Sequence, residues 1–143
     1  MFLKSHNKPE SKTITDIEYL NLRLSGMRVT EEYEFTSAEN NIEIAYYNMS
    51  YANGSEERIP IKRTICEKKT VIDALNGFDF IKWNGFHGNH PRGVLDGTMF
   101  KLTAVYNGGE RLQADGSQNF PKHFNEFRMW LYGILNESEE TGE

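Results

Sequence analysis

The stretch MFKLTAVYNGGERLQA, residues 99–114, contains the strongest hairpin signal in the chain. Every second residue of its first half is apolar: Phe100, Leu102, Ala104 and Tyr106. This two-residue period predicts a strand with one buried face. The sequence Asn-Gly-Gly at 107–109 then predicts a tight turn into a second strand at Arg111–Ala114, because Asn-Gly pairs tolerate the backbone angles of hairpin turns.

The N-terminal half shows the same period. Leu20, Leu22 and Leu24 share one face of a predicted strand, and Ser25-Gly26 predicts a tight turn in which the glycine supplies a positive φ. Residues 42–51 are apolar on both faces, which indicates either a central strand or an edge strand with an interface. In the next segment, residues 59–65, Pro60 cannot donate a ladder hydrogen bond and therefore indicates a sheet edge or the start of a strand.

Helical spacing replaces this alternation in two places. The first predicted helix has Thr70 as its N-cap, and Gly77 indicates that it ends early and leaves residues 78–83 extended. The second has Pro121 in its first turn. Its apolar stripe comprises Phe124, Phe127, Leu131, Ile134 and Leu135. Burial of this stripe contributes on the order of 10 kcal/mol before chain entropy is subtracted, so we assign it to the core.

These segments together predict a single α+β domain at residues 13–136. Its antiparallel β-sheet, an N-terminal meander plus a C-terminal hairpin, packs against two helices. Residues 1–12 are polar and aperiodic, which predicts a flexible N-terminal arm, and residues 137–143 predict a disordered acidic tail. A chain of 143 residues fits one domain of ordinary size.

The amino-acid composition limits the cellular compartments and the classes of partner that we expect for this protein. The single cysteine, Cys66, excludes an internal disulfide and fits a reducing compartment. No run approaches the roughly 18 apolar residues of a membrane span, and the N-terminus shows no apolar signal region. A net charge of −5 disfavours binding to nucleic acid, which needs clustered Lys and Arg. We therefore predict a cytoplasmic protein with neither a membrane nor a nucleic-acid partner.

The glycine-rich stretch WNGFHGNHPRG, residues 83–93, is the first candidate site. His87 and His90 have a spacing that suits zinc, but a zinc site needs further ligands, and no recognised ligand motif accompanies them. The glycines follow a predicted helix and precede a strand, the reverse of a phosphate loop. We therefore predict no metal and no cofactor, with the histidines bonded to loop backbone and Arg92 in a surface salt bridge.

Two Asp-Gly pairs flank the predicted C-terminal hairpin. Asp96 and Asp115 would suit acid–base catalysis if their environments separated their pKa values. Asp-Gly is, however, also common in turns, and Ser117 lacks the glycines of a nucleophile elbow. Turns are therefore the favoured interpretation. No catalytic residue is assigned, and the candidates for such a role are His87, His90, Asp96 and Asp115.

Aromatic residues next to glycine-rich segments suit a groove for a peptide or a small apolar ligand. Most of these rings are expected in the core or its lid. The predicted ligand-binding residues are Trp83, Phe86, Arg92 and Tyr47.

Residues 93–135 resemble a pattern found in uncharacterised bacterial proteins, especially from Gram-positive gut bacteria. In that pattern Asp-Gly-Thr-x-aromatic-x-Leu opens a strand, and Gly-Ser-x-x-aromatic-Pro-x-x-Phe starts a helix. The matching residues are Asp96, Gly97, Thr98, Phe100, Leu102, Gly116, Ser117, Phe120, Pro121 and Phe124. The resemblance implies a hairpin docked on the following helix, in a domain of unknown function without assigned catalytic residues. We expect Ser117 or Asn119 to cap that helix, and Phe120 with Phe124 to fasten it to the hairpin.

Two functions follow as hypotheses. The preferred one is a non-enzymatic domain that binds a protein or a small ligand, with homo-oligomer formation through an exposed strand edge as an added option. The alternative is a small metal- or His/Asp-dependent hydrolase centred on residues 83–97.

Overall fold

The computed structural model describes residues 13–26, 29–52, 54–95 and 97–141. It confirms the α+β class, because one seven-stranded and mostly antiparallel sheet packs against two α-helices. In chain order the elements are β1 (Ile17–Ser25), β2 (Thr30–Ala38), β3 (Asn41–Ala52), β4 (Ser55–Glu67), α1 (Lys68–Gly77), the 3₁₀ helix η2 (Phe80–Trp83), β5 (His87–Gly88), β6 (Met99–Tyr106), β7 (Glu110–Ser117) and α2 (Phe124–Thr141).

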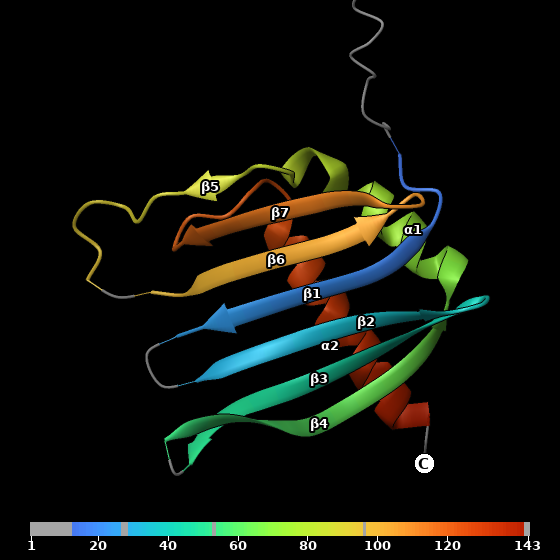
Figure 1. The fold of residues 1–143 in the computed structure, drawn as a ribbon, viewed down its shortest axis with the longest axis horizontal. Helices are drawn as coiled ribbons and strands as arrows, with labels where there is room; N and C mark the ends of the chain where they lie inside the picture. Colours follow the sequence, from blue (N-terminus) through green and yellow to red (C-terminus); the bar gives the residue numbers. More distant parts are fainter. Residues whose placement is uncertain (1–12, 27–28, 53, 96, 142–143) are drawn as a thin grey trace, which may run out of the picture.

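The strand order in the sheet is β4-β3-β2-β1-β6-β7-β5 (Figure 1). The four N-terminal strands form the predicted meander, and β6 with β7 forms the predicted hairpin. Antiparallel pairing of β1 with β6, in which Leu22 lies opposite Leu102, joins the two parts. The short strand β5 runs parallel to β7 and closes that edge.

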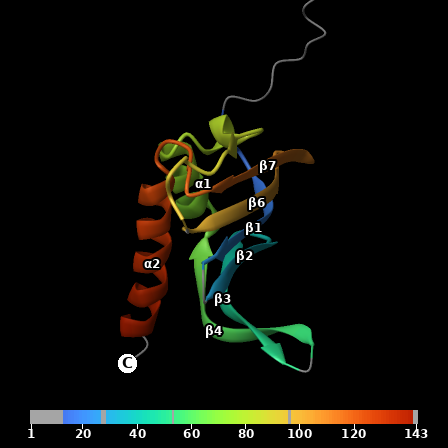
Figure 2. The same cartoon turned by 90° about the vertical axis from the view of Figure 1, so that its left-hand side faces the viewer.

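Both α-helices cover the same face of the sheet, and the opposite face carries no helix among the described residues (Figure 2). The alternation in β1 decides which side chains lie on which face, since successive residues of a strand point in opposite directions. Leu20, Leu22 and Leu24 are buried under the helices, whereas Asn21 and Arg23 lie on the uncovered face and are only half-buried.

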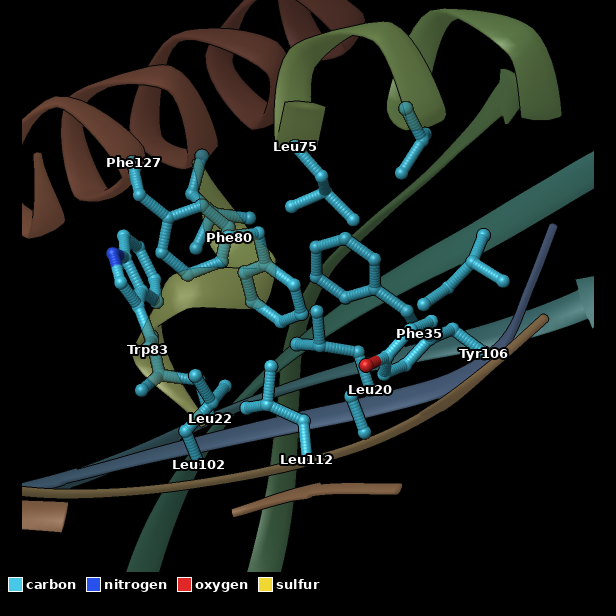
Figure 3. Close-up of a cluster of buried hydrophobic side chains, with 14 of the residues drawn as sticks. Leu20, Leu22, Phe35, Leu75, Phe80, Trp83, Leu102, Tyr106, Leu112 and Phe127 are labelled. Carbon is cyan, nitrogen blue, oxygen red and sulfur yellow. The ribbon is translucent and has the colours of Figure 1, made fainter. Parts of the chain in front are cut away.

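Large aromatic rings from α2, η2 and the sheet fill the space between the layers (Figure 3). The ring of Trp83 lies 5.7 Å from that of Phe127 and 5.2 Å from that of Phe80, centroid to centroid. The stripe of α2 is core as predicted, with Phe124, Phe127, Leu131 and Leu135 buried and Ile134 packed at its margin.

The first helix begins and ends differently from the prediction. It starts at Lys68 with Glu67 in the N-cap position, two residues before Thr70. Residues 78–83 are not extended, since they form a turn and then η2. The three-residue period of a 3₁₀ helix explains the difference, because it places Phe80 and Trp83 on the same side, where both rings are buried.

Two details of the turns are also corrected. Gly26 does not adopt a positive φ, and its N–H bonds to the Val29 carbonyl, so the β1–β2 turn is longer than a Ser-Gly pair. Neither Ser117 nor Asn119 caps α2, because their side chains bond to His90 and to the Asn89 carbonyl instead. The expected packing of Phe120 on Phe124 is present, with stacked rings 5.0 Å apart.

The sheet order settles the open alternatives for the N-terminal strands. β3 is internal and β4 is an edge strand, as Pro60 indicated, although β4 begins earlier at Ser55. At the other end of the chain, α2 continues to Thr141 and so enters the segment predicted as a disordered tail. The predicted arm, residues 1–12, lies outside the described residues. None of the described helices combines the length and apolarity needed to cross a membrane.

Candidate functional site

A cavity of about 500 Å³ opens at the end of the sheet where β1, β5 and β7 finish and β6 begins. These strand ends lie on the left in Figure 1. We call this cavity the sheet-end cavity. Its polar lining includes Arg23, Ser25, His87, His90, Lys101, Asp115 and Ser117. Met99 and Phe100 add apolar surface to the same wall.

Strand register brings these side chains together from distant parts of the chain. Arg23 lies opposite Lys101, Lys101 opposite Asp115, and Asp115 opposite His87, which makes one row across four strands. Directly opposite residues in a sheet share a face. A second row, one pleat further on, places Met99 between Ser25 and Ser117.

The first row contains a histidine–carboxylate pair. The Nδ1 atom of His87 lies 2.5 Å from Oδ1 of Asp115. Asp115 therefore lies within strand β7 and holds an imidazole, which corrects the prediction that it belongs to a turn. This contact fixes the His87 ring and leaves its Nε2 atom without a hydrogen-bond partner among the described residues.

The second row contains a histidine–serine pair. Nε2 of His90 lies 2.5 Å from the Val94 carbonyl oxygen, and Nδ1 of His90 lies 2.7 Å from Oγ of Ser117. A carbonyl oxygen only accepts, so Nε2 must carry a proton. In the neutral imidazole Nδ1 then carries no proton, and its lone pair accepts a hydrogen bond from the Ser117 hydroxyl.

The cations of the cavity differ in their pairing. Arg23 forms a salt bridge with Glu56, and this hydrogen bond raises the pKa of Arg23. Lys101 forms no ion pair with any described residue, because the carboxylate opposite it, Asp115, is turned to His87. Two cations and one carboxylate line the cavity. The chain as a whole has a net charge of −5, so this site is locally less negative than the protein.

Two glycines allow neighbouring segments of the cavity wall to pack closely against each other. A Cβ at Gly88 would lie 2.7 Å from the Asn119 Cβ, and one at Gly116 would lie 2.8 Å from Cε1 of Phe100 and against the Asn119 carbonyl oxygen. No real Cβ approaches neighbours so closely. The glycines thus let residue Asn119 pass beneath β5 and β7, which accounts for one of the glycines in WNGFHGNHPRG.

The predicted ligand-binding residues do not come together. Trp83 is only 2% exposed and donates its Nε1–H to the Lys122 carbonyl, so its ring belongs to the core. Phe86 packs on Phe100, with centroids 6.2 Å apart. Tyr47 lies on β3, where the Arg58 guanidinium stacks 3.8 Å above its ring.

Arg92 lies on the exposed part of the loop between β5 and β6, and it forms no salt bridge with a described residue. It is also absent from the lining of the sheet-end cavity. The structure therefore brings together two of the histidines and Asp115 from the sequence-based candidates, but none of the predicted ligand-binding side chains.

The chemistry of the two imidazoles bears on metal binding. Both ring nitrogens of His90 are engaged, one by Ser117 and one by the Val94 carbonyl. Within the described part of the chain, no three His, Cys, Asp or Glu side chains gather as a metal site would require. Asp96 lies outside the described residues. Cys66 is on β4, the opposite edge of the sheet, where burial raises the pKa of its thiol.

A second cavity, of about 290 Å³, lies between α2 and the strands β2–β4. Some of its polar groups have protein partners: the Tyr46 hydroxyl donates to Glu31 over 3.0 Å, and Lys62 Nζ donates to Asn136 over 2.5 Å. Burial raises the pKa of Tyr33 to about 12, so this phenol remains neutral. Each cavity is lined by a cation without a described ion-pair partner, Lys101 in one and Arg128 in the other. The sheet-end cavity is the larger of the two and also offers the Nε2 atom of His87, and is therefore the stronger candidate.

Sequence reasoning did not place Arg23, Lys101 or Ser117 in a site. Arg23 and Lys101 occupy the polar positions of alternating strands, a pattern that marks the uncovered face but not a cavity. Ser117 was expected to cap the following helix and was rejected as a nucleophile, and its partner His90 is 27 residues away in the chain. A scan against known protein families matches no family model, and a search of curated proteins finds no similar sequence.

Proposed function

We propose that this protein is a binding domain whose ligand occupies the sheet-end cavity. The ligand is a small molecule that combines an anionic oxygen group with an apolar part. The volume of about 500 Å³ lies within the range of ordinary small-molecule sites.

Lys101 is the observation on which the proposal rests. Lys101 lines the cavity, and its ammonium group lacks an ion-pair partner among the described residues. An anion bound there would gain a charge-assisted hydrogen bond, which contributes about 1.5–3 kcal/mol. Arg23 on the neighbouring strand is already paired with Glu56, so Lys101 is the cation that remains available to the anion.

The rest of the lining specifies the remaining parts of the ligand. Met99 is 52% exposed and offers a flexible apolar surface next to the ring of Phe100. The free Nε2 of His87 gives one further hydrogen-bonding atom. Gly116 and Ser117, which belong to the segment that resembles uncharacterised bacterial proteins, line the same cavity. The proposal also includes membership of that group of bacterial proteins and a cytoplasmic location.

Phenyl phosphate, with one anion and one ring, is a suitable test ligand. We expect it to bind the wild-type protein in a calorimetric or NMR titration. Replacing Lys101→Met should weaken binding by about tenfold or more, since about 1.4 kcal/mol corresponds to one factor of ten. Lys82→Met is the matched control, because Lys82 is an exposed lysine on η2 that does not line the cavity. Equal binding by both variants would refute the assignment.

The sequence also raised self-association through a strand edge. β4 is such an edge, and Ile59, Ile61 and Ile65 are exposed on it. However, Pro60 has no N–H to donate, and Arg63 places a charge on the same strand; proline and charge both hinder edge pairing. We therefore expect a monomer in light scattering, and a stable dimer that dissociates on Ile61→Lys would contradict this expectation.

A further inference from the structure

We propose that the sheet-end cavity also catalyses acyl transfer, with Ser117 as the nucleophile and His90 as its general base. The substrate class is a small carboxylic ester, which is hydrolysed. This inference rests on the proposed function, because the carbonyl oxygen of the ester takes the place of the anionic oxygen next to Lys101.

The arrangement of Ser117, His90 and Val94 satisfies the geometric requirements for an activated serine. A serine hydroxyl becomes nucleophilic when an adjacent base accepts its proton and a third group orients that base. Nδ1 of His90 lies 2.7 Å from the Ser117 Oγ, within reach of proton transfer. The Val94 carbonyl holds the opposite nitrogen over 2.5 Å and fixes the tautomer in which Nδ1 is the free base.

Charge stabilisation can come from Lys101. In the β6–β7 pair, Met99 lies opposite Ser117 and Lys101 opposite Asp115, so Lys101 is the diagonal neighbour of Ser117 on the same face. Diagonal neighbours are about 7–8 Å apart at their Cα atoms, and long side chains span that distance. The ammonium can therefore reach an oxygen on a carbon attached to Ser117, where negative charge develops during acyl transfer.

Each step balances with these groups and water. Ser117 Oγ bonds to the ester carbonyl carbon, its proton passes to Nδ1 of His90, and the carbonyl π electrons move to the oxygen near Lys101. Those electrons then re-form the C=O bond, the ester C–O bond breaks, and the leaving alkoxide takes the proton from Nδ1. Water attacks the acyl-serine in the same way, with its proton passing to His90 and then to Ser117. The products are a carboxylic acid and an alcohol.

The cavity contains its own comparison residue. Ser25 lines the same cavity from β1, opposite Met99, but no described histidine bonds to its hydroxyl. Accessibility alone would make Ser25 and Ser117 similar towards a reagent. Activation by His90 would distinguish them, so the site of reaction reports on the imidazole rather than on exposure.

An alkyl fluorophosphonate, which reacts with activated serines, tests the inference on the wild-type protein. After timed incubation, peptide mass spectrometry should locate the label at Ser117, formed at least about 100-fold faster than any label at Ser25. His90→Gln should slow the labelling of Ser117 by about 100-fold or more. Ser50→Ala, a serine substitution on β3 outside the cavity, should leave it unchanged.

Phenyl phosphate binding, measured in the same samples, separates the two proposals and shows that the variants are folded. Labelling of Ser117 no faster than that of Ser25, in protein that still binds phenyl phosphate, would overturn the catalytic inference and leave the binding function intact. If the wild-type protein shows neither labelling of Ser117 nor binding of phenyl phosphate, both the binding function and the catalytic inference are overturned. Ser117→Ala should abolish labelling, and release of p-nitrophenol from p-nitrophenyl acetate should fall with it.

Discussion

The two ends of the uncovered sheet face carry their charges in different arrangements. At the β2–β4 end the charges are paired across strands: Arg58 bonds Glu32 over 3.0 Å and Glu34 over 2.9 Å, and Arg63 bonds Glu43 over 2.8 Å. At the β6–β7–β5 end Lys101 has no such partner among the described residues, and the carboxylate opposite it holds an imidazole.

This difference separates charges that support the sheet from charges that remain available to a ligand. Cross-strand ion pairs stabilise a register but satisfy both partners, so they offer little to a third group. The Lys101 ammonium has no ion-pair partner among the described residues and lies beside two oriented imidazoles, so it remains available to a ligand. The predictions below test this contrast between the paired end and the cavity end, beginning with the core that both ends share.

The largest effect is expected at Trp83, which anchors the segment leading to β5. Trp83→Ala removes a buried ring that contacts Phe80 and Phe127, and should lower the free energy of unfolding by about 3–5 kcal/mol in urea denaturation. Tyr47→Ala, at the paired end, should cost only about 1 kcal/mol, mostly its cation–π contact with Arg58. Similar losses for the two variants would contradict the placement of Trp83 in the core.

Gly116 should give the next largest effect. Gly116→Ala forces a Cβ against the Asn119 carbonyl and the Phe100 ring, and should destabilise the fold by about 1–3 kcal/mol while weakening phenyl phosphate binding. Gly133→Ala is the matched control in α2, where nothing lies within 4 Å of the added atom. There the change should raise stability by about 0.5–1 kcal/mol, because alanine favours a helix. Thermal denaturation of both variants resolves these opposite signs.

Removal of the paired guanidinium should have a smaller effect. Arg58→Met breaks two partly exposed salt bridges and the contact with the Tyr47 ring, so the expected loss is about 1–2 kcal/mol after allowance for solvent screening. Arg92→Met, at an exposed arginine without an ion pair to a described residue, should change stability by less than about 0.5 kcal/mol. Urea titrations of the two variants at neutral pH compare them directly, and a larger loss for Arg92→Met would reverse the contrast.

The same network should show a small dependence on pH. Burial opposes the ionisation of Glu34, but hydrogen bonds from Arg58 and Tyr19 outweigh it and lower the pKa of this carboxyl. A lowered folded-state pKa contributes stability that is complete above the ordinary glutamate pKa of about 4.3, and that is lost as the pH falls through the folded value. The stability difference between wild type and Arg58→Met should therefore shrink between pH 7 and pH 3. An unchanged difference would show that Glu34 is not held by Arg58.

Local periodicity was enough to predict most elements of the fold. The alternation at residues 20–24 and 100–106 and the stripe of α2 depend on neighbouring residues only, and the structure confirms all three. Element boundaries were less predictable where tertiary packing decides them. Residues 78–83 became a turn and a 3₁₀ helix because Phe80 and Trp83 both reach the core.

The candidate site depended on pairings that no local pattern encodes. β5 has only two residues, too few for a period, and it exists because His87 and Gly88 pair with the end of β7. Asp115-Gly116-Ser117 has the composition of a turn but forms a strand, since Gly116 is required for the close passage of Asn119. Both histidines were identified from the sequence, but their partners and the neighbouring lysine came from the register of distant strands.

An NMR titration of ¹⁵N-labelled protein with phenyl phosphate tests the central claim most directly. We expect saturable amide shifts concentrated at the sheet-end cavity, including Gly88, Lys101 and Gly116, with Tyr47 and Arg58 unchanged. Lys101→Met should abolish most of these shifts. Shifts that are absent, or that concentrate at Tyr47 and Arg58 instead, would contradict the assignment of the cavity as the ligand site.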